Sequence, residues 1–198
     1  MKVRIICATN NKGKISEIKE IFKGTDFEIV SLKEAGITHN TVEDADTFMG
    51  NAIKKAKEIY ELTKTPALSD DSGLVVDALD GAPGVYSARF AGENATDSEN
   101  IQKLLKLMEG KTNRAARFEC SIALVLSDSE IITATGSCEG EITTSPRGEG
   151  GFGYDPVFFV KEYKKTFAEI PMEEKNKISH RARALKELMR VLKEKSII

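Results

Sequence analysis

Two pairs of adjacent acids stand out as possible ligands of a divalent cation. Glu43 and Asp44 lie in a polar segment, and Asp70 and Asp71 follow a short apolar run. Carboxylate oxygens suit Mg²⁺, which keeps several of its waters and bridges the phosphates of a substrate. Turns and helix caps use the same residue types, so these four acids alone favour neither interpretation.

A polar turn separates the apolar residues 3–8 from a helical period that begins at Ile15. Its members are Thr9, Asn10, Asn11, Lys12, Gly13 and Lys14. A turn between a strand and a helix offers unpaired backbone N–H groups and the positive end of the helix dipole. The two lysines add charges suited to phosphate. The turn lacks the GxxxxGK[ST] pattern, and local pattern alone favours a solvated, well-capped helix start.

A glycine-rich loop could hold a nucleobase. Residues 148–153 contain four glycines and Phe152, followed by Tyr154, Asp155 and Pro156. Glycine lets the backbone approach a ligand closely, and an aromatic ring can stack on a base. Local pattern alone favours a tight hairpin or a bulge.

Four basic side chains gather before and at the start of the last predicted helix. They are Lys175, Lys177, His180 and Arg181. Positive charge at a helix N-terminus opposes the helix dipole, which makes sense if an anion or an electron-rich ligand binds there. A basic, solvated helix end is an equally good interpretation. Taken together, the four segments describe a nucleoside phosphate site with separate regions for phosphate, metal and base.

Composition excludes several classes of protein. The chain of 198 residues has 29 basic and 31 acidic residues and a formal net charge of -2, whereas a broad nucleic-acid surface needs a basic face. No apolar run reaches membrane-spanning length, and the apolar stretch within the first eight residues is shorter than a signal peptide requires. The cysteines form no CxxC pair, and we expect Cys7 and Cys120 to be buried free thiols. We therefore expect a cytoplasmic protein without a membrane or polymeric nucleic-acid partner.

Hydrophobic periodicity predicts a mixture of helices and hairpin-like strands. Strands are expected at residues 3–8, 27–32, 116–126, 130–134 and 157–160, and helices at residues 15–22, at residues 48–60, after a capping box at Thr96 and after Ser179. Residues 66–76 are expected to form two short strands interrupted by an acidic turn. The lysines of residues 48–60 are expected on the solvent side of their helix. The pattern is typical of a single α/β domain, residues 1–198, with a mixed sheet.

Six sequence motifs carry a resemblance to a known family. They are ATNNKGK, TFMGNA, LSDDSGL, GAPGVYSARFAG, GEGGFGYDPVFF and KISHRARAL, in that order along nearly the whole chain. The set resembles the inosine/xanthosine triphosphate pyrophosphatase family, also called the Ham1-like family. The resemblance implies an elongated, two-lobed α/β fold around a twisted mixed sheet with flanking helices. It also implies an active-site cleft between the lobes and a homodimer.

The resemblance assigns roles to individual residues. Asp71 matches a metal-linked proton acceptor with Asp70 beside it, and Glu43 matches a metal ligand, so Mg²⁺ is the expected cofactor. The implied substrate contacts are Thr9, Asn10, Asn11, Lys12, Gly13, Lys14, Ser72, Arg89, Phe152, Gly153, Tyr154, Asp155, Lys175, His180 and Arg181. The family often has an acid where this chain has Gly50, which leaves Glu43, Asp70 and Asp71 to hold the metal.

The implied reaction converts inosine, deoxyinosine or xanthosine triphosphate to the monophosphate and pyrophosphate. Asp71, directly or with Asp70, would orient a water for in-line attack at the α-phosphorus. Donors from His180, Arg181 or loop amides could recognise a 6-oxo group, which adenine lacks. The alternatives are a Maf-like nucleotide pyrophosphatase, a haloacid-dehalogenase-like phosphatase and a nucleotide-binding module without catalysis.

Overall fold

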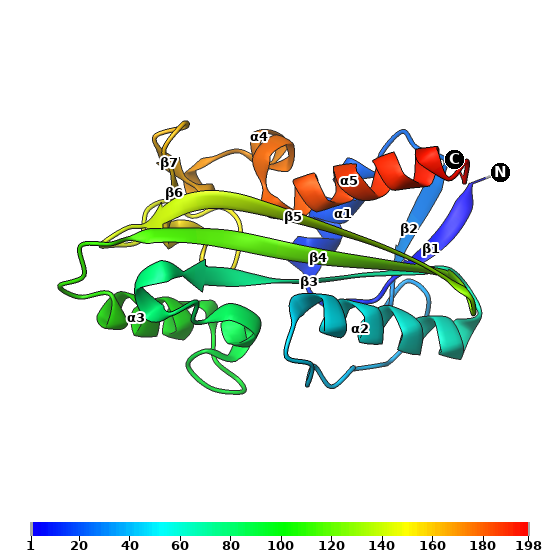
Figure 1. Ribbon diagram of the computed structural model, residues 1–198, viewed down its shortest axis with the longest axis horizontal. Coiled ribbons are helices and arrows are strands. Elements are labelled where there is room, and N and C mark those ends of the chain that lie inside the picture. The colour runs from blue at the N-terminus through cyan, green and yellow to red at the C-terminus, as the bar shows by residue number, and fades with distance from the viewer. Residues whose placement is uncertain (1, 198) are drawn as a thin grey trace. The chain divides into compact units, whose positions relative to one another are not determined.

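The computed structural model describes residues 2–197, which contain both helices and strands (Figure 1). The helices are α1 (Lys12–Ile21), α2 (Phe48–Thr63), α3 (Asp97–Leu107), α4 (Met172–Ile178) and α5 (His180–Glu194). The strands are β1 (Val3–Cys7), β2 (Phe27–Ser31), β3 (Ala67–Val76), β4 (Ala115–Ser127), β5 (Glu130–Ile142), β6 (Phe158–Val160) and β7 (Lys165–Thr166). Among these residues no helix is long and apolar enough to cross a membrane. Apart from the two short strands expected around Asp70 and Asp71, each predicted helix and strand is present; α4 and β7 are additional.

The strands form one mixed sheet in the order β2-β1-β3-β4-β5-β6-β7. β1 pairs in parallel with β2, from Val3 opposite Phe27 to Cys7 opposite Ser31, and in parallel with β3. β6 pairs antiparallel with both β5 and β7. The parallel pair β1–β2 is joined by α1, the usual connection between parallel neighbours. The sheet and its flanking helices confirm the predicted α/β class.

The acidic residues of β3 lie within a continuous strand. We expected two short strands interrupted by a turn, and this was wrong, because residues 67–76 are extended throughout. Side chains alternate between the two faces of a strand, so the adjacent Asp70 and Asp71 project to opposite faces. Because of this alternation, the two carboxylates have different neighbours.

The chain divides into two compact units, and the first holds both ends of the described chain. This unit contains the residues up to Asp71, Cys120–Gly136 and the residues from Arg181 onward. Within it, α1 and α5 cover one face of the strands and α2 covers the other (Figure 1). Ile18, Leu185 and Leu188 pack with buried strand residues on the α1/α5 face, where Cys7 and Cys120 are free thiols as predicted.

The second unit contains Ser72–Glu119 and Ser137–His180. Its core joins α3 to an aromatic cluster in which the Phe118 and Phe158 rings lie 4.5 Å apart. The His180 ring stacks on Phe118 with centroids 4.7 Å apart. α3 begins at the capping box of Thr96 and Glu99 that the sequence predicts. The helix is therefore fixed both at its first turn and along its buried face.

Two leucines on α3 test this description of the core. Leu104 is fully buried, whereas Leu107 is 44% exposed. Replacing Leu104 by alanine should lower the free energy of unfolding by about 2–5 kcal/mol, because the buried side chain leaves a cavity. Leu107→Ala, the matched control, should change it by only about 0.5 kcal/mol. Urea denaturation measures both, and equal effects would contradict the assigned face of α3.

Candidate active site

Asp70 lies at the centre of a buried ion-pair network on the α1/α5 face. Its carboxylate oxygen Oδ2 is 3.0 Å from Arg181 Nη2 and 3.4 Å from Lys14 Nζ. The Arg181 guanidinium also pairs with Glu17 through Nη1. Asp70, Glu17 and Arg181 are all at most 3% exposed. Two buried acids are thus held by one arginine from α5 and one lysine from α1.

The network sets the protonation state of Asp70. Burial alone would raise the pKa of this carboxyl, but the charges of Lys14 and Arg181 outweigh burial and hold the pKa below its ordinary value. The pKa of Arg181 is raised, because its attraction to Asp70 and Glu17 outweighs the opposing effect of burial. Asp70 is therefore a permanently ionised group near neutral pH.

Asp71 has different partners on the α2 face. The Asn51 Nδ2 group donates to Asp71 Oδ2 at 3.0 Å, and Lys55 Nζ is 3.6 Å from Asp71 Oδ1. Lys55 Nζ also donates to Glu43 Oε1 at 2.7 Å. Our expectation that the lysines of α2 all face solvent was wrong for Lys55, which is 6% exposed. Its ammonium group thus links the two carboxylates expected to bind metal.

The pKa of Asp71 is shifted in the opposite direction from that of Asp70. Burial raises it, and although Lys55 and Lys14 oppose this effect, the nearby charge of Glu43 reinforces it and the pKa stays above its ordinary value. Two adjacent carboxyls with pKa values pushed apart are typical of a site in which the two groups perform different roles. A raised pKa suits a group that accepts a proton near neutral pH.

Glu43 and Asp71 have the donor chemistry of a Mg²⁺ site. Within residues 2–197 no three His, Cys, Asp or Glu side chains converge as a ready-made metal site. Mg²⁺ commonly needs only one or two protein carboxylates, because water and substrate phosphates complete its coordination. Glu43 and Asp71 already share one cation, Lys55 Nζ. Asp70, in contrast, is engaged by Arg181 and Lys14.

The polar turn before α1 has the capping geometry that local pattern favours. Asn11 is the N-cap, and its side chain accepts from Lys14 N at 3.1 Å. Thr9 Oγ1 accepts from Asn11 N at 3.1 Å. Lys12, Gly13 and Lys14 form the first helical residues, so their backbone amides lie at the positive end of α1. Capping and phosphate binding are compatible here, because the cap uses Lys14 N and a phosphate could use the preceding amides of Lys12 and Gly13.

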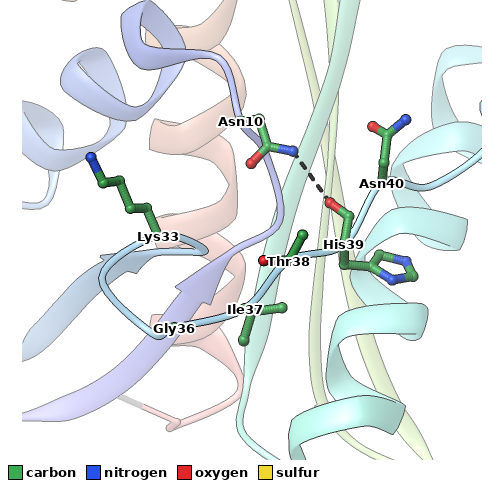
Figure 2. Close-up of a pocket in the computed structure, with 7 residues that line it drawn as sticks. All are labelled: Asn10, Lys33, Gly36, Ile37, Thr38, His39 and Asn40. Carbon is green, nitrogen blue, oxygen red and sulfur yellow. Dashed lines mark hydrogen bonds between the residues drawn. The ribbon is translucent and has the colours of Figure 1, made fainter.

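The turn is connected to the loop that carries Glu43. Figure 2 shows the Asn10 side chain donating to the His39 carbonyl oxygen, a bond of 3.3 Å beside a pocket of about 530 Å³. A second pocket, of about 90 Å³, is lined in part by Thr9, Asn10, Glu43 and Lys55. The structure therefore brings the predicted phosphate turn and the predicted metal ligand to one pocket of the first unit.

In the second unit, hydrogen bonds to neighbouring residues fix the conformation of the glycine-rich loop. Asp155 Oδ2 accepts from Phe152 N at 3.1 Å and from Lys175 Nζ at 2.7 Å. Tyr154 donates through its hydroxyl to Ser87 O at 2.6 Å, and Gly153 N donates to Asp97 Oδ2 at 2.8 Å. Asp155, Tyr154 and Lys175 thus hold the loop, with the half-buried Phe152 ring at its tip beneath the Lys175 ammonium, 5.0 Å away.

Gly151 is one position of this loop that requires glycine. Its φ of +71° is in the left-handed region, and a Cβ atom there would collide with the Asp155 carboxylate. A side chain at this position would therefore disturb the group that holds Phe152 and Lys175.

The remaining predicted contacts are distributed between the two units. His180 is buried on the aromatic cluster of the second unit. Arg181, the next residue, belongs to the first unit and pairs with Asp70 and Glu17. Ser72 directly follows Asp71 in β3, and the Arg89 guanidinium lies 5.1 Å from the Tyr86 ring centre.

Sequence reasoning missed four polar residues. Three of them, Glu17, Asn51 and Lys55, are buried residues of the first unit's helices and contact Arg181, Asp71 and Glu43, respectively. The spacing of Asn51 and Lys55, four apart beside the apolar stripe of α2, was the available signal. Both polar atoms of the Asn176 side chain are buried and have no hydrogen-bond partner among residues 2–197.

Comparison with known proteins identifies the family. The family model described as "Ham1 family" matches residues 5–191. The chain belongs to the Ham1 family. It is 54% identical to a dITP/XTP pyrophosphatase of Desulforamulus reducens over 192 residues, 96% of each chain. It is 48% identical to the dITP/XTP pyrophosphatase of Bacillus subtilis, covering 97% of this chain and 98% of that relative.

Solved structures of Ham1 proteins share the fold. The Ham1 protein of Staphylococcus aureus superposes with a TM-score of 0.86 at 41% identity, covering 97% of this chain and 99% of that one. The Ham1 protein of Coxiella burnetii gives a TM-score of 0.87 at 43% identity, with the same coverage. The arrangement of α-helices around a mixed sheet is thus that of the Ham1 family.

Stability measurements on the metal-free protein test the division between the two aspartates. Asp70→Asn should cost about 3–5 kcal/mol, because it leaves the buried Arg181 without its partner. Asp71→Asn should leave the melting temperature at pH 7 equal or higher, because the fold disfavours the ionised carboxylate. The sign follows from the raised pKa: the cost of Asp71 is present above that pKa and disappears as the pH falls toward about 4. Equal losses of stability in both variants would contradict this division.

Proposed function

We propose that this chain is a Mg²⁺-dependent pyrophosphohydrolase of non-standard purine nucleoside triphosphates. The substrates would be the triphosphates of inosine, deoxyinosine and xanthosine, and the products the monophosphate and pyrophosphate. The observation that carries the proposal is the pair Asp70 and Asp71, whose pKa values are shifted in opposite directions next to Lys14 and Lys55. Ham1 relatives named dITP/XTP pyrophosphatase support the substrate class.

The triphosphate would bind at the polar turn before α1. The first backbone amides of α1 and the ammonium of Lys14 provide positive charge, and Lys12 adds a second ammonium. Thr9, Asn10 and Asn11 provide polar side chains in the same turn. Phosphate binding at a helix N-terminus requires this combination of N–H groups and charge.

Glu43 and Asp71 would hold Mg²⁺. When bound, the ion would screen the phosphate charges and polarise the α-phosphate. Asp70 was expected as a third ligand, but its ion pairs with Arg181 and Lys14 favour a supporting role for this residue. Lys55 would then move from bridging the two carboxylates to contacting a phosphate oxygen.

Asp71 would orient the attacking water and accept its proton. The water oxygen forms a bond to the α-phosphorus, and the bond from that phosphorus to its bridging oxygen breaks on the opposite side. Pyrophosphate leaves, and the proton of the water passes to an Asp71 oxygen. The raised pKa of Asp71 supports this role, because general-base catalysis is most effective when the pKa of the base approaches the working pH.

The nucleobase would bind at the glycine-rich loop of the second unit. Phe152 is proposed to stack on the base, while Tyr154, Asp155 and Lys175 hold the loop in place. Gly153, His180 and the buried side-chain amide of Asn176 would provide the polar groups for the base edge. Ser72 and Arg89 remain proposed substrate contacts. Arg181 was expected to contact substrate too, but its bonds to Asp70 and Glu17 favour an electrostatic role.

Selectivity would arise from donors that face the 6-oxo group of hypoxanthine and xanthine. Adenine presents an amino donor at this position, which would leave the protein donors unpaired. Guanine shares the 6-oxo group, so its rejection would require a site with no favourable place for its 2-amino group. A buried donor without a partner costs about 1–3 kcal/mol, and sites of this kind reject the wrong analogue strongly. A homodimer and a cytoplasmic location also belong to this proposal, supported by resemblance alone.

A product assay tests the reaction. Purified protein with Mg²⁺ should release monophosphate and pyrophosphate from inosine and xanthosine triphosphates and should largely spare adenosine and guanosine triphosphates.

Asp71→Asn should reduce turnover by at least about 100-fold, because it removes the proton acceptor. Orthophosphate as the product, or full turnover in that variant, would contradict the proposal; saturable binding without product would indicate a binding module.

Phe152→Ala tests the site of the base. Loss of stacking should weaken inosine monophosphate binding by about 1–3 kcal/mol, whereas inhibition by pyrophosphate, which has no base, should not change. Phe159→Ala is the matched control, since this half-buried ring packs against Arg147 outside the loop. Calorimetry measures each affinity, and unchanged monophosphate binding in Phe152→Ala would place the base elsewhere.

A further inference from the structure

Asn51 is a fully buried polar residue in the first unit. It is the fourth residue of α2 and is 0% exposed. A buried amide must use its hydrogen-bonding groups or lose stability. The partners of this side chain therefore indicate what it does.

The two ends of the Asn51 amide contact two different parts of the proposed metal site. Asn51 Oδ1 accepts from the backbone N–H of Ala45 at 3.0 Å, two residues after Glu43. Asn51 Nδ2 donates to Asp71 Oδ2 at 3.0 Å. A backbone N–H can only donate and an ionised carboxylate can only accept, so the orientation of the amide is determined by its neighbours.

The loop that carries Glu43 lies directly on the first turn of α2. A Cβ atom built on Gly50 would be 2.8 Å from the Ala45 Cβ atom and 3.1 Å from Thr47 Oγ1. A side chain at position 50 would therefore push the loop away from the helix. This close approach shows, independently of the Asn51 bonds, that the loop packs directly on the helix turn that contains Asn51.

Lys55, one turn further along α2, completes the arrangement. Its Nζ atom contacts Asp71 Oδ1 at 3.6 Å and Glu43 Oε1 at 2.7 Å. Asn51 thus holds the Oδ2 atom of Asp71 and leaves Oδ1 on the side of Lys55 and Glu43. Each of the two residues contacts both Asp71 and the loop at 43–45.

We propose that Asn51 is a positioning residue of the reaction, which fixes the orientation of the Asp71 carboxylate and sets its distance from the Glu43 loop. The inference rests on the proposed function, in which Asp71 and Glu43 hold Mg²⁺. Asn51 itself touches neither metal nor substrate. It acts through the two bonds of its amide, as groups that orient metal ligands commonly do.

Two substitutions separate positioning from folding. Asn51→Asp keeps the size of the side chain and the acceptor for Ala45 but loses the donor to Asp71; Asn51→Leu removes both bonds without adding charge. Each should lower kcat for inosine triphosphate by about 10–100-fold, with a much smaller change in KM. Thr47→Ala is the matched control, because it removes the N-cap bond of α2 to Gly50. It should lower the melting temperature and leave kcat close to that of the wild type.

A reversed pair tests the bond itself without an activity assay. Asn51→Asp places two carboxylates side by side and should lower the melting temperature of the metal-free protein. Adding Asp71→Asn should restore much of it, because the amide and carboxylate have exchanged places, yet turnover should not return. A wild-type kcat in Asn51→Asp and Asn51→Leu, or a reversed pair no more stable than Asn51→Asp, would overturn the proposal. Failure of the proposed function is seen separately, as a wild-type protein that releases no pyrophosphate.

Discussion

The central constraint in this structure is the burial of two adjacent carboxylates in one strand. Transferring a carboxylate from water is costly unless charges and hydrogen bonds compensate for the lost hydration. Alternation along β3 sends Asp70 toward α1 and α5 and Asp71 toward α2. Asp70 is compensated by Arg181 and Lys14, and its pKa falls; Asp71 is compensated less completely, and its pKa rises. The chemical difference between identical neighbours therefore comes from which helix each one faces.

The other buried polar groups of the first unit follow from this constraint. The Arg181 guanidinium has more N–H donors than the Asp70 carboxylate alone can accept from, and its Nη1 group pairs with the Glu17 carboxylate. On the other face, Lys55 links Asp71 to Glu43, so the loop that carries Glu43 is held near β3 before any metal binds. Such preorganisation lowers the reorganisation that a charged substrate would require. The same logic applies to the second unit, where Asp155 is neutralised by a buried lysine and fixes the loop.

Local sequence pattern was sufficient to predict most of the helices and strands, because amphipathic segments and helix caps depend on residues that are close to one another along the chain. The capping box at Thr96 and the strand–helix–strand order at the N-terminus are examples. It failed where distant partners decide the outcome. The partner of Asp70 lies 111 residues further along the chain, and Lys55 is buried only because two carboxylates compensate its charge. Likewise the sequence around Asp71 resembles a turn, yet pairing in the sheet keeps it extended.

A carboxyl titration of the metal-free protein tests the central claim most directly. Protein labelled with ¹³C at aspartate carboxyls would be followed by NMR from acid to neutral pH, with Asp70→Asn and Asp71→Asn identifying the two signals. We expect Asp71 to titrate above the ordinary aspartate value of about 3.9 and Asp70 to titrate below it. The reverse order, or two signals that both titrate near the ordinary value, would contradict the division of roles between them.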